Sequence, residues 1–231
     1  MGLEESSRRQ RDATALLNSE TGVRRLFWIV IAALVLYVVL DAVAQSLPPY
    51  YSPIKDAESD LAVGPYGYIM AINFLNRGIL ALVFLYALSK TVKADLGTVG
   101  SFRAGMYVFG VWAVGAILLA FFPTDVPPTP VSWHGVIHLI VAALAFLGGS
   151  FGALMLSLQF TRSDALRSVK TPALVVAALS VLLLFVGFGT LNGPIGGLTE
   201  RIFLGSVLLW QLVVSLHLAR RRSGVGQVAE Q

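Results

Sequence analysis

The sequence predicts an all-α fold: a polytopic membrane protein built as a bundle of six transmembrane helices, with both termini in the cytoplasm. Hydrophobic residues make up 56% of the 231 residues and charged residues only 13%, whereas soluble domains carry about 25% charged residues. The apolar residues gather into six runs, each close to the roughly 20 residues that cross a bilayer. The lysines and arginines form short clusters between these runs, a pattern typical of membrane topology rather than of nucleic-acid binding.

The first run covers residues 26–47 and follows a polar, charged stretch, residues 1–25. We interpret that stretch as a cytoplasmic N-terminal tail with room for a short surface helix. Ala42-Val43-Ala44 has the small-x-small form of a signal-peptidase site, so cleavage there is an alternative. The long polar leader and the acidic side chain of Asp41 favour an uncleaved span.

The other five spans are expected at residues 66–89, 102–122, 133–160, 172–190 and 200–218. A loop rich in proline, tyrosine and acidic residues, 47–65, separates the first two. Pro172 falls in the first turn of the fifth span, where proline is tolerated. The transmembrane domain therefore covers residues 26–219, and residues 220–231 form a cytoplasmic C-terminal tail.

The basic residues set the expected orientation. With the N-terminus inside, the inner face collects Arg8, Arg9, Arg11, Arg24, Arg25, Lys90, Lys93, Arg103, Arg162, Arg167, Lys170, Arg220, Arg221 and Arg222. Only Lys55 and Arg201 fall at the outer face, and Arg77 lies within a span. Because cytoplasmic connections carry the excess of Lys and Arg, we expect both termini on the cytoplasmic side of the cell membrane.

Small and absent residue types add two constraints. The chain has no cysteine, which excludes disulfides, thiolate metal sites and cysteine nucleophiles. Glycines at Gly105 and Gly110, and at Gly148, Gly149 and Gly152, suggest close contacts between helices.

The densest group of potential ligands lies in residues 121–138, which hold Asp125, His134 and His138. The two histidines lie one helical turn apart on the same face of the fourth span. This spacing can hold one divalent metal such as Zn²⁺, with Asp125 or Glu58 completing the shell. The alternative is that His134 is an interfacial residue beside Trp133 and that His138 bonds a neighbouring helix.

Two further groups of charged residues are singled out. Asp41 and Arg77 lie in the first two spans, and a lone charge in hydrocarbon is expensive, so we expect them to form a buried ion pair. Glu200 and Arg201 open the sixth span. Their position is typical of helix capping after Thr199, and it also lets them face the cluster around Asp125.

The chain resembles a family of six-helix bacterial and archaeal membrane proteins, domain-of-unknown-function family 998. The resemblance rests on Ser52-Pro53, Ser59-Asp60-Leu61-Ala62-Val63-Gly64-Pro65-Tyr66-Gly67, Phe122-Pro123-Thr124-Asp125, Gly135-Val136-Ile137-His138 and Glu200-Arg201. The family usually shows Ser-Glu-Leu where this chain has Ser59-Asp60-Leu61. The resemblance implies a six-helix bundle and a shared polar set of Asp60, Asp125, His138, Glu200 and Arg201, without an established activity.

These patterns favour a membrane protein with an outward-facing polar pocket for a lipid headgroup, a small ligand or a partner protein. The expected ligand-binding residues are Asp60, Asp125, His134, His138, Glu200 and Arg201. The alternatives are a metal-dependent membrane hydrolase or transferase acting on lipid, a transporter or proton path, and an accessory subunit of a larger membrane complex. Expected partners are membrane lipids, with a membrane-protein partner or a second copy of the chain as further options, and no nucleic acid.

Overall fold

The computed structural model describes residues 2–97 and 99–221, and side chains from residue 20 onward. Within this part, six helices are long and apolar enough to cross a membrane, which confirms the predicted spans. They are α1 (Gly2–Ser46), α2 (Gly67–Thr91), α4 (Gly100–Leu119), α5 (Trp133–Gln159), α6 (Lys170–Thr190) and α7 (Gly196–Arg220). Short helices lie between them: η1 (Glu58–Ala62), α3 (Lys93–Leu96), η2 (Phe160–Arg162) and η3 (Arg167–Val169).

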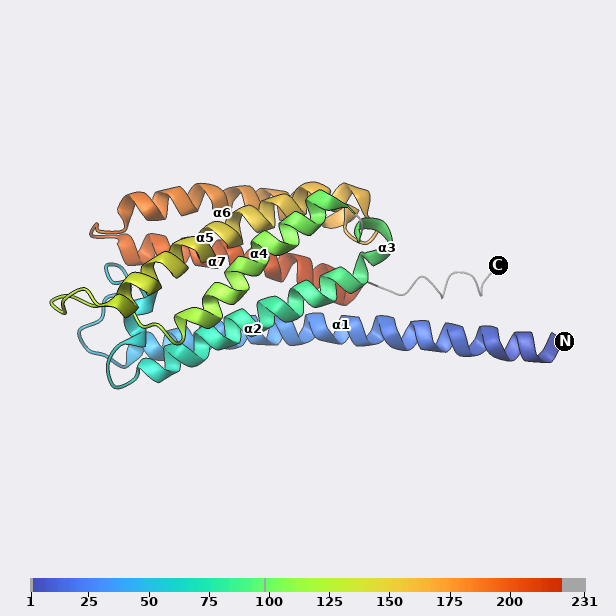
Figure 1. Ribbon diagram of the computed structural model, residues 1–231, viewed down its shortest axis with the longest axis horizontal. Helices are drawn as coiled ribbons and strands as arrows, with labels where there is room; N and C mark the ends of the chain where they lie inside the picture. The colour runs from blue at the N-terminus through green and yellow to red at the C-terminus, as the bar shows by residue number, and fades with distance from the viewer. Residues whose placement is uncertain (1, 98, 222–231) are drawn as a thin grey trace.

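The six long helices form a closed ring in chain order. Each packs against its neighbours in the sequence, and α1 closes the ring against α7. Figure 1 shows that α1 extends well beyond the other helices at its N-terminal end. The stretch that we interpreted as a tail is thus the continuation of the first spanning helix, since α1 begins at Gly2. Most of the predicted C-terminal tail, residues 222–231, lies outside the described residues.

An aromatic cluster fills the middle of the ring of helices. The centroid of the Trp210 side-chain ring lies 5.6 Å from that of the Phe84 side chain and 5.1 Å from that of the Phe109 side chain. All three side chains are fully buried, and the Trp210 indole N–H donates to Ser157 Oγ at 2.8 Å. Burying such aromatic side chains from three helices holds the ring together, and the hydrogen bond satisfies the polar atom of the indole.

Glycines let α5 approach α4 closely. A Cβ atom added at Gly148 would lie 2.7 Å from the Val108 carbonyl oxygen, and one at Gly152 would lie 2.5 Å from the Phe109 nitrogen. The expected close contacts are therefore present on α5. Gly110 is different, because its nearest side-chain neighbour would be 4.0 Å away.

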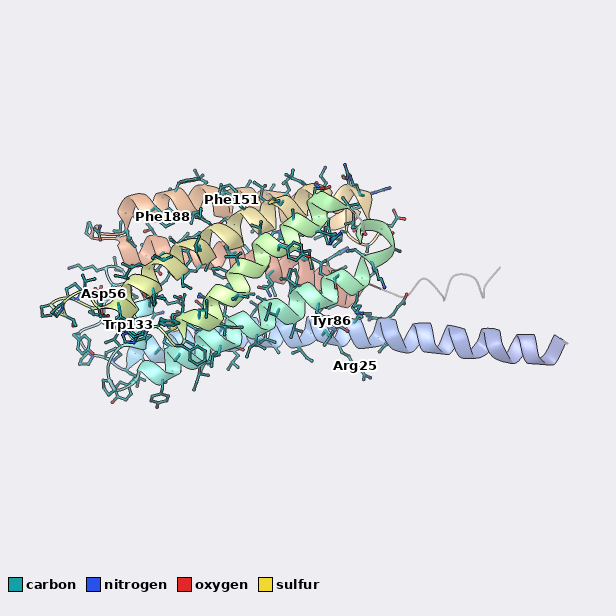
Figure 2. The ribbon with its side chains drawn as sticks, in the orientation of Figure 1. Arg25, Asp56, Tyr86, Trp133, Phe151 and Phe188 are labelled. Carbon is teal, nitrogen blue, oxygen red and sulfur yellow. The ribbon has the colours of Figure 1, made fainter. Side chains whose placement is uncertain are left out.

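Three connections, residues 47–66, 120–132 and 191–195, lie together at one end of the ring, which we call the long-loop end. Asp56 and Trp133 lie at this end, and Arg25 and Tyr86 lie toward the other (Figure 2). The short helix η1 contacts α2 and α7 here. Leu61 of η1 is buried with Met70 and other apolar residues. This anchor places the start of η1, at Glu58, inside the mouth of the ring.

Candidate functional site

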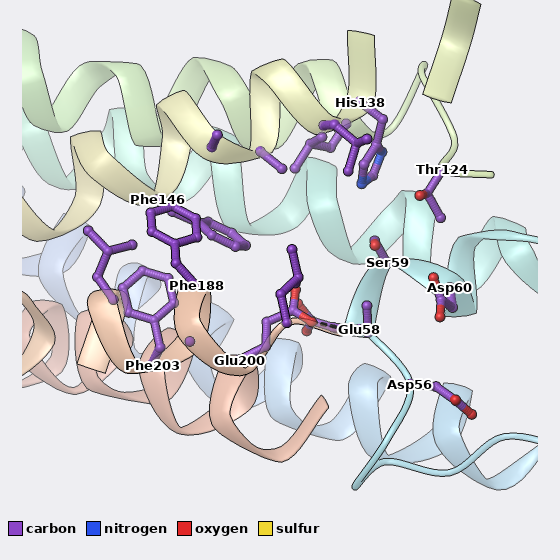
Figure 3. A pocket seen from close by; sticks show the side chains of 18 of the residues that line it. Asp56, Glu58, Ser59, Asp60, Thr124, His138, Phe146, Phe188, Glu200 and Phe203 are labelled. Carbon is purple, nitrogen blue, oxygen red and sulfur yellow. Dashed lines mark hydrogen bonds between the residues drawn. The ribbon is translucent and has the colours of Figure 1, made fainter. Parts of the chain in front are cut away.

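A pocket of about 460 Å³ lies at the long-loop end between η1, α5, α6 and α7. One part of its wall is polar and the other is apolar (Figure 3). The polar residues are Lys55, Asp56, Glu58, Ser59, Asp60, Arg77, Thr124, His138, Asn192 and Glu200. The apolar part includes Phe146 of α5, Phe188 of α6 and Phe203 of α7.

Glu58 and Arg77 form a buried ion pair in the polar wall. Arg77 Nη1 lies 3.5 Å from Glu58 Oε2, and only 2–3% of either side chain is exposed. Glu58 Oε1 also accepts a hydrogen bond from the hydroxyl of Tyr37. The Arg77 guanidinium lies 4.6 Å from the Trp112 ring centroid and 5.1 Å from that of Phe74. Paired charges and aromatic faces together compensate the burial of Arg77.

The expected ion pair between Asp41 and Arg77 is replaced by this one. Within the described residues, Arg77 has its ion pair with Glu58, and Asp41 accepts a hydrogen bond from Gln45 one turn further along α1. Asn73, on the same face as Arg77, donates to the Tyr37 carbonyl oxygen at 3.1 Å. The polar side chains of α2 therefore bind α1 through the backbone and Tyr37, while η1 supplies the acid.

Glu200 is the second buried acid of the wall, with 8% of the residue exposed. Its Oε2 accepts the backbone N–H of Glu58 at 3.1 Å. Within the described part of the chain, no ion pair joins Glu200 to a basic residue.

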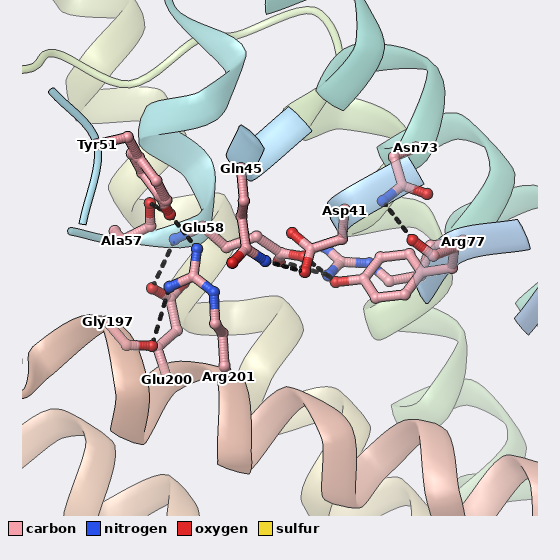
Figure 4. A network of polar contacts seen from close by, with 11 residues as sticks. Asp41, Gln45, Tyr51, Ala57, Glu58, Asn73, Arg77, Gly197, Glu200 and Arg201 are labelled. Carbon is pink, nitrogen blue, oxygen red and sulfur yellow. Dashed lines mark hydrogen bonds and ion pairs between the residues drawn. The ribbon is translucent and has the colours of Figure 1, made fainter. Parts of the chain in front are cut away.

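Arg201 does not line the pocket, and it fastens the first loop to α7 (Figure 4). Its Nη1 donates to the carbonyl oxygens of Pro53, Asp56 and Gly197 at 3.1, 3.0 and 3.0 Å. Its Nη2 donates to the hydroxyl of Tyr51. Burial raises the pKa of Tyr51, so the phenol stays neutral and donates to the Ala57 carbonyl oxygen at 2.8 Å.

Asp60 lies at the outer side of the pocket, on η1 (Figure 3). Burial raises its pKa from 3.8 to about 6, and the nearby carboxylate of Asp56 adds to the shift. Asp56 itself accepts the backbone N–H of Ser52 at 2.7 Å.

Asp125 lies outside the pocket and organises the loop before α5. Its Oδ2 accepts the backbone N–H of Ser132 at 2.6 Å, and its Oδ1 accepts the Ser132 hydroxyl at 2.8 Å. These bonds lower the pKa of Asp125. Ser132 is the N-cap of α5 and accepts the backbone N–H of Gly135 at 3.1 Å. A Cβ at position 135 would collide with the Asp125 carboxylate, which explains the glycine.

The two histidines do not converge with Asp125 as metal ligands. His138 is buried, lines the pocket, and its Nδ1 lies 2.7 Å from the Phe122 carbonyl oxygen. Because a carbonyl can only accept, Nδ1 carries the proton. His134 instead packs beside Trp133 and Phe122. Among the described residues, no group of three or more His, Asp or Glu side chains is arranged to hold one ion.

The pocket thus gathers three of the six expected ligand residues, namely Asp60, His138 and Glu200. Glu58 was foreseen only as an extra metal ligand. It stands out in no local pattern, because it is one of several acids in a loop whose fold the sequence does not specify. The sequence did not predict Phe146, Phe188 and Phe203 as site residues, because apolar residues that line a pocket cannot be distinguished by sequence from other apolar residues of a membrane helix.

A family model described as a protein of unknown function (DUF998) matches residues 30–217. The chain belongs to the DUF998 family. The matched region of this DUF998 protein contains every residue that lines the pocket. Comparisons with curated proteins and with solved structures find no match to this chain.

Proposed function

We propose that this DUF998 protein binds an amphiphilic ligand from the membrane. The polar group of the ligand would lie among Glu58, His138 and Glu200, and its apolar chain would lie along Phe146, Phe188 and Phe203. The observation that carries this proposal is the joining of a polar and an apolar wall in one pocket between α5, α6 and α7. The volume of about 460 Å³ falls within the roughly 300–1,000 Å³ typical of ligand sites.

The exposure of three apolar side chains in the pocket wall supports entry of the ligand from the lipid. Leu139 of α5, Phe188 of α6 and Leu191, which follows α6, line the pocket, yet they are 59%, 41% and 48% exposed. In a membrane, such exposed apolar side chains face acyl chains. A ligand chain could therefore pass from the bilayer between these helices without crossing water.

The long-loop end is proposed to face the outside of the cell membrane, with both termini in the cytoplasm. Lys55 is the one basic residue in its three connections, 47–66, 120–132 and 191–195. At the other end, the last turn of α2 carries Lys90, and the connections carry Lys93, Arg162 and Arg167. The excess of basic residues on cytoplasmic connections favours this orientation.

Filling the pocket tests the proposal. A Cβ at Gly187 or at Gly189 of α6 would meet nothing within 4 Å, but only Gly187 lines the pocket. Gly187→Leu should therefore occupy the pocket, and Gly189→Leu is the matched control. Both changes favour the helix in propensity.

The measurement is native mass spectrometry of detergent-purified protein with equal amounts of dioleoyl phosphatidylethanolamine, phosphatidylcholine and phosphatidylglycerol. We expect Gly187→Leu to bind about tenfold less total lipid than the wild type, a loss equivalent to the burial of about two methylene groups. The control should bind like the wild type. Equal lipid binding in all three proteins would contradict the proposal.

A further inference from the structure

We infer that the polar wall of the pocket selects a primary ammonium group, carried on an apolar chain, and that Glu200 is the counter-ion of this group. The inference deepens the proposed binding of an amphiphile and rests on it.

The charges of the wall are not balanced. Four acids line the pocket, Asp56, Glu58, Asp60 and Glu200, against two bases, Lys55 and Arg77. Glu58 and Arg77 neutralise each other as an ion pair, and Lys55 is exposed to solvent at the rim. The buried part of the wall therefore keeps one acid, Glu200, that forms no ion pair in the described chain. Arg201, the next residue of α7, does not line the pocket and bonds the Pro53 carbonyl and the Tyr51 hydroxyl instead.

Glu200 is more than nine-tenths buried, and only one of its oxygens, Oε2, has a hydrogen bond from the described residues. A buried carboxylate is expensive unless it is paired and hydrogen-bonded. The hydrogen bond from the Glu58 N–H compensates part of this cost. A cation bound in the pocket would compensate the remaining cost of burying the Glu200 carboxylate.

The neighbouring polar groups favour a cation with N–H donors. His138 uses the proton on Nδ1 to bond the Phe122 carbonyl, and in the neutral ring this leaves Nε2 as an acceptor. Its ring points toward the pocket (Figure 3). The one guanidinium of the wall, Arg77, is already paired. A primary ammonium has three donors for such acceptors, a quaternary ammonium has none, and an anionic group would meet the excess of acids.

The test compares lipids that differ in amine methylation. Native mass spectrometry with dioleoyl phosphatidylethanolamine and phosphatidylcholine measures selectivity at equal phosphate and chain content. We expect the wild type to prefer phosphatidylethanolamine by about tenfold, because one charge-assisted hydrogen bond contributes a free energy of about this size. Glu200→Gln should lose this preference while still binding lipid, because the amide oxygen can accept the Glu58 N–H. Asp164→Asn, which removes an exposed acid outside the pocket, should keep it.

A second pair of probes, dodecylamine and dodecyltrimethylammonium, distinguishes a free long-chain amine from a lipid headgroup. A preference for the primary amine in either pair supports the inference and identifies its source. Equal binding within both pairs by the wild type, or a Glu200→Gln protein that keeps the preference, would overturn it. The wild-type comparison does not depend on the folding of any variant. Failure of this inference is distinct from failure of the proposed function, which Gly187→Leu tests.

Discussion

The buried charges of Arg77 and Glu58 at the long-loop end are stabilised by each other rather than by water. Arg77 lies among three aromatic rings and contacts both Glu58 and Tyr37. Removing one member of a buried pair typically costs about 3–5 kcal/mol, because the other charge stays buried. Glu58 thus links η1 to α2 by its side chain and to α7 by its backbone N–H.

Asp60 should make stability depend on pH. Its folded-state pKa of about 6 lies above the ordinary 3.8, so the folded protein binds a proton that the unfolded chain has released. Stability therefore falls as the pH rises from about 4 to about 6, and the loss is complete above that window. Asp60→Asn removes this penalty. With allowance for partial solvent exposure, we expect the variant to be more stable at pH 7 by about 1 kcal/mol, or roughly 2–4 °C.

Thermal unfolding in detergent between pH 4 and 8 measures this difference. The midpoint of Asp60→Asn minus that of the wild type should be near zero at pH 4, grow to pH 6 and then level off. A difference that stays constant with pH would show that Asp60 acts by packing alone.

Individual residues were harder to predict than helices. The sequence indicated that Arg77 needs an acid, since a charge within a span must be compensated. It suggested Asp41, which lies in a neighbouring helix at similar depth, because the position of a loop acid such as Glu58 depends on how η1 folds into the ring. Asp125 was also expected in the site, because the sequence does not specify how its loop folds. Its bonds to Ser132 are local, and the short distance in sequence between the two residues could have suggested them.

At the scale of elements, the contact between the first loop and α7 positions η1. The first turn of α7 donates the Gly197 N–H to the Lys55 carbonyl and the Leu198 N–H to the Ile54 carbonyl, at 3.2 and 3.0 Å. Loop carbonyls thus satisfy helix N–H groups that have no partner within the helix. A Cβ at Gly197 would collide with the Asp56 carbonyl oxygen, so the backbone approach requires glycine here.

Gly197→Ala should displace the loop and lower both stability and lipid binding. Overpacking against backbone typically costs about 1–3 kcal/mol, and the loss of Glu58 from its place would disturb the polar wall. Gly205→Ala is the matched control on the same helix, since a Cβ there meets nothing within 4 Å. Thermal unfolding and lipid binding should fall for Gly197→Ala alone. If both variants behave alike, the loop contact does not position the site.

At the scale of the whole molecule, the sequence predicts those features that the bilayer imposes, namely the number and positions of the spanning helices. Each spanning helix must satisfy its own backbone hydrogen bonds and present apolar side chains to lipid, so length and hydropathy identify it. This logic recovered all six spans. It says nothing about which helices leave space between them, and α5 and α7 make few direct contacts. The pocket arises from this spacing, and from small residues such as Ala142, Ala143 and Gly187 in its wall.

Orientation in the membrane can be tested directly, because the natural chain has no cysteine. Lys55 is exposed at the long-loop end, and Asp164, with 86% of its side chain exposed, lies in the connection before η3 at the opposite end. In intact cells, a membrane-impermeant maleimide should label Lys55→Cys and spare Asp164→Cys, which should react only after permeabilisation. The reverse pattern would place the long-loop end in the cytoplasm. The pocket would then draw its ligand from the inner leaflet, and the asymmetry of basic residues would not govern this protein's insertion.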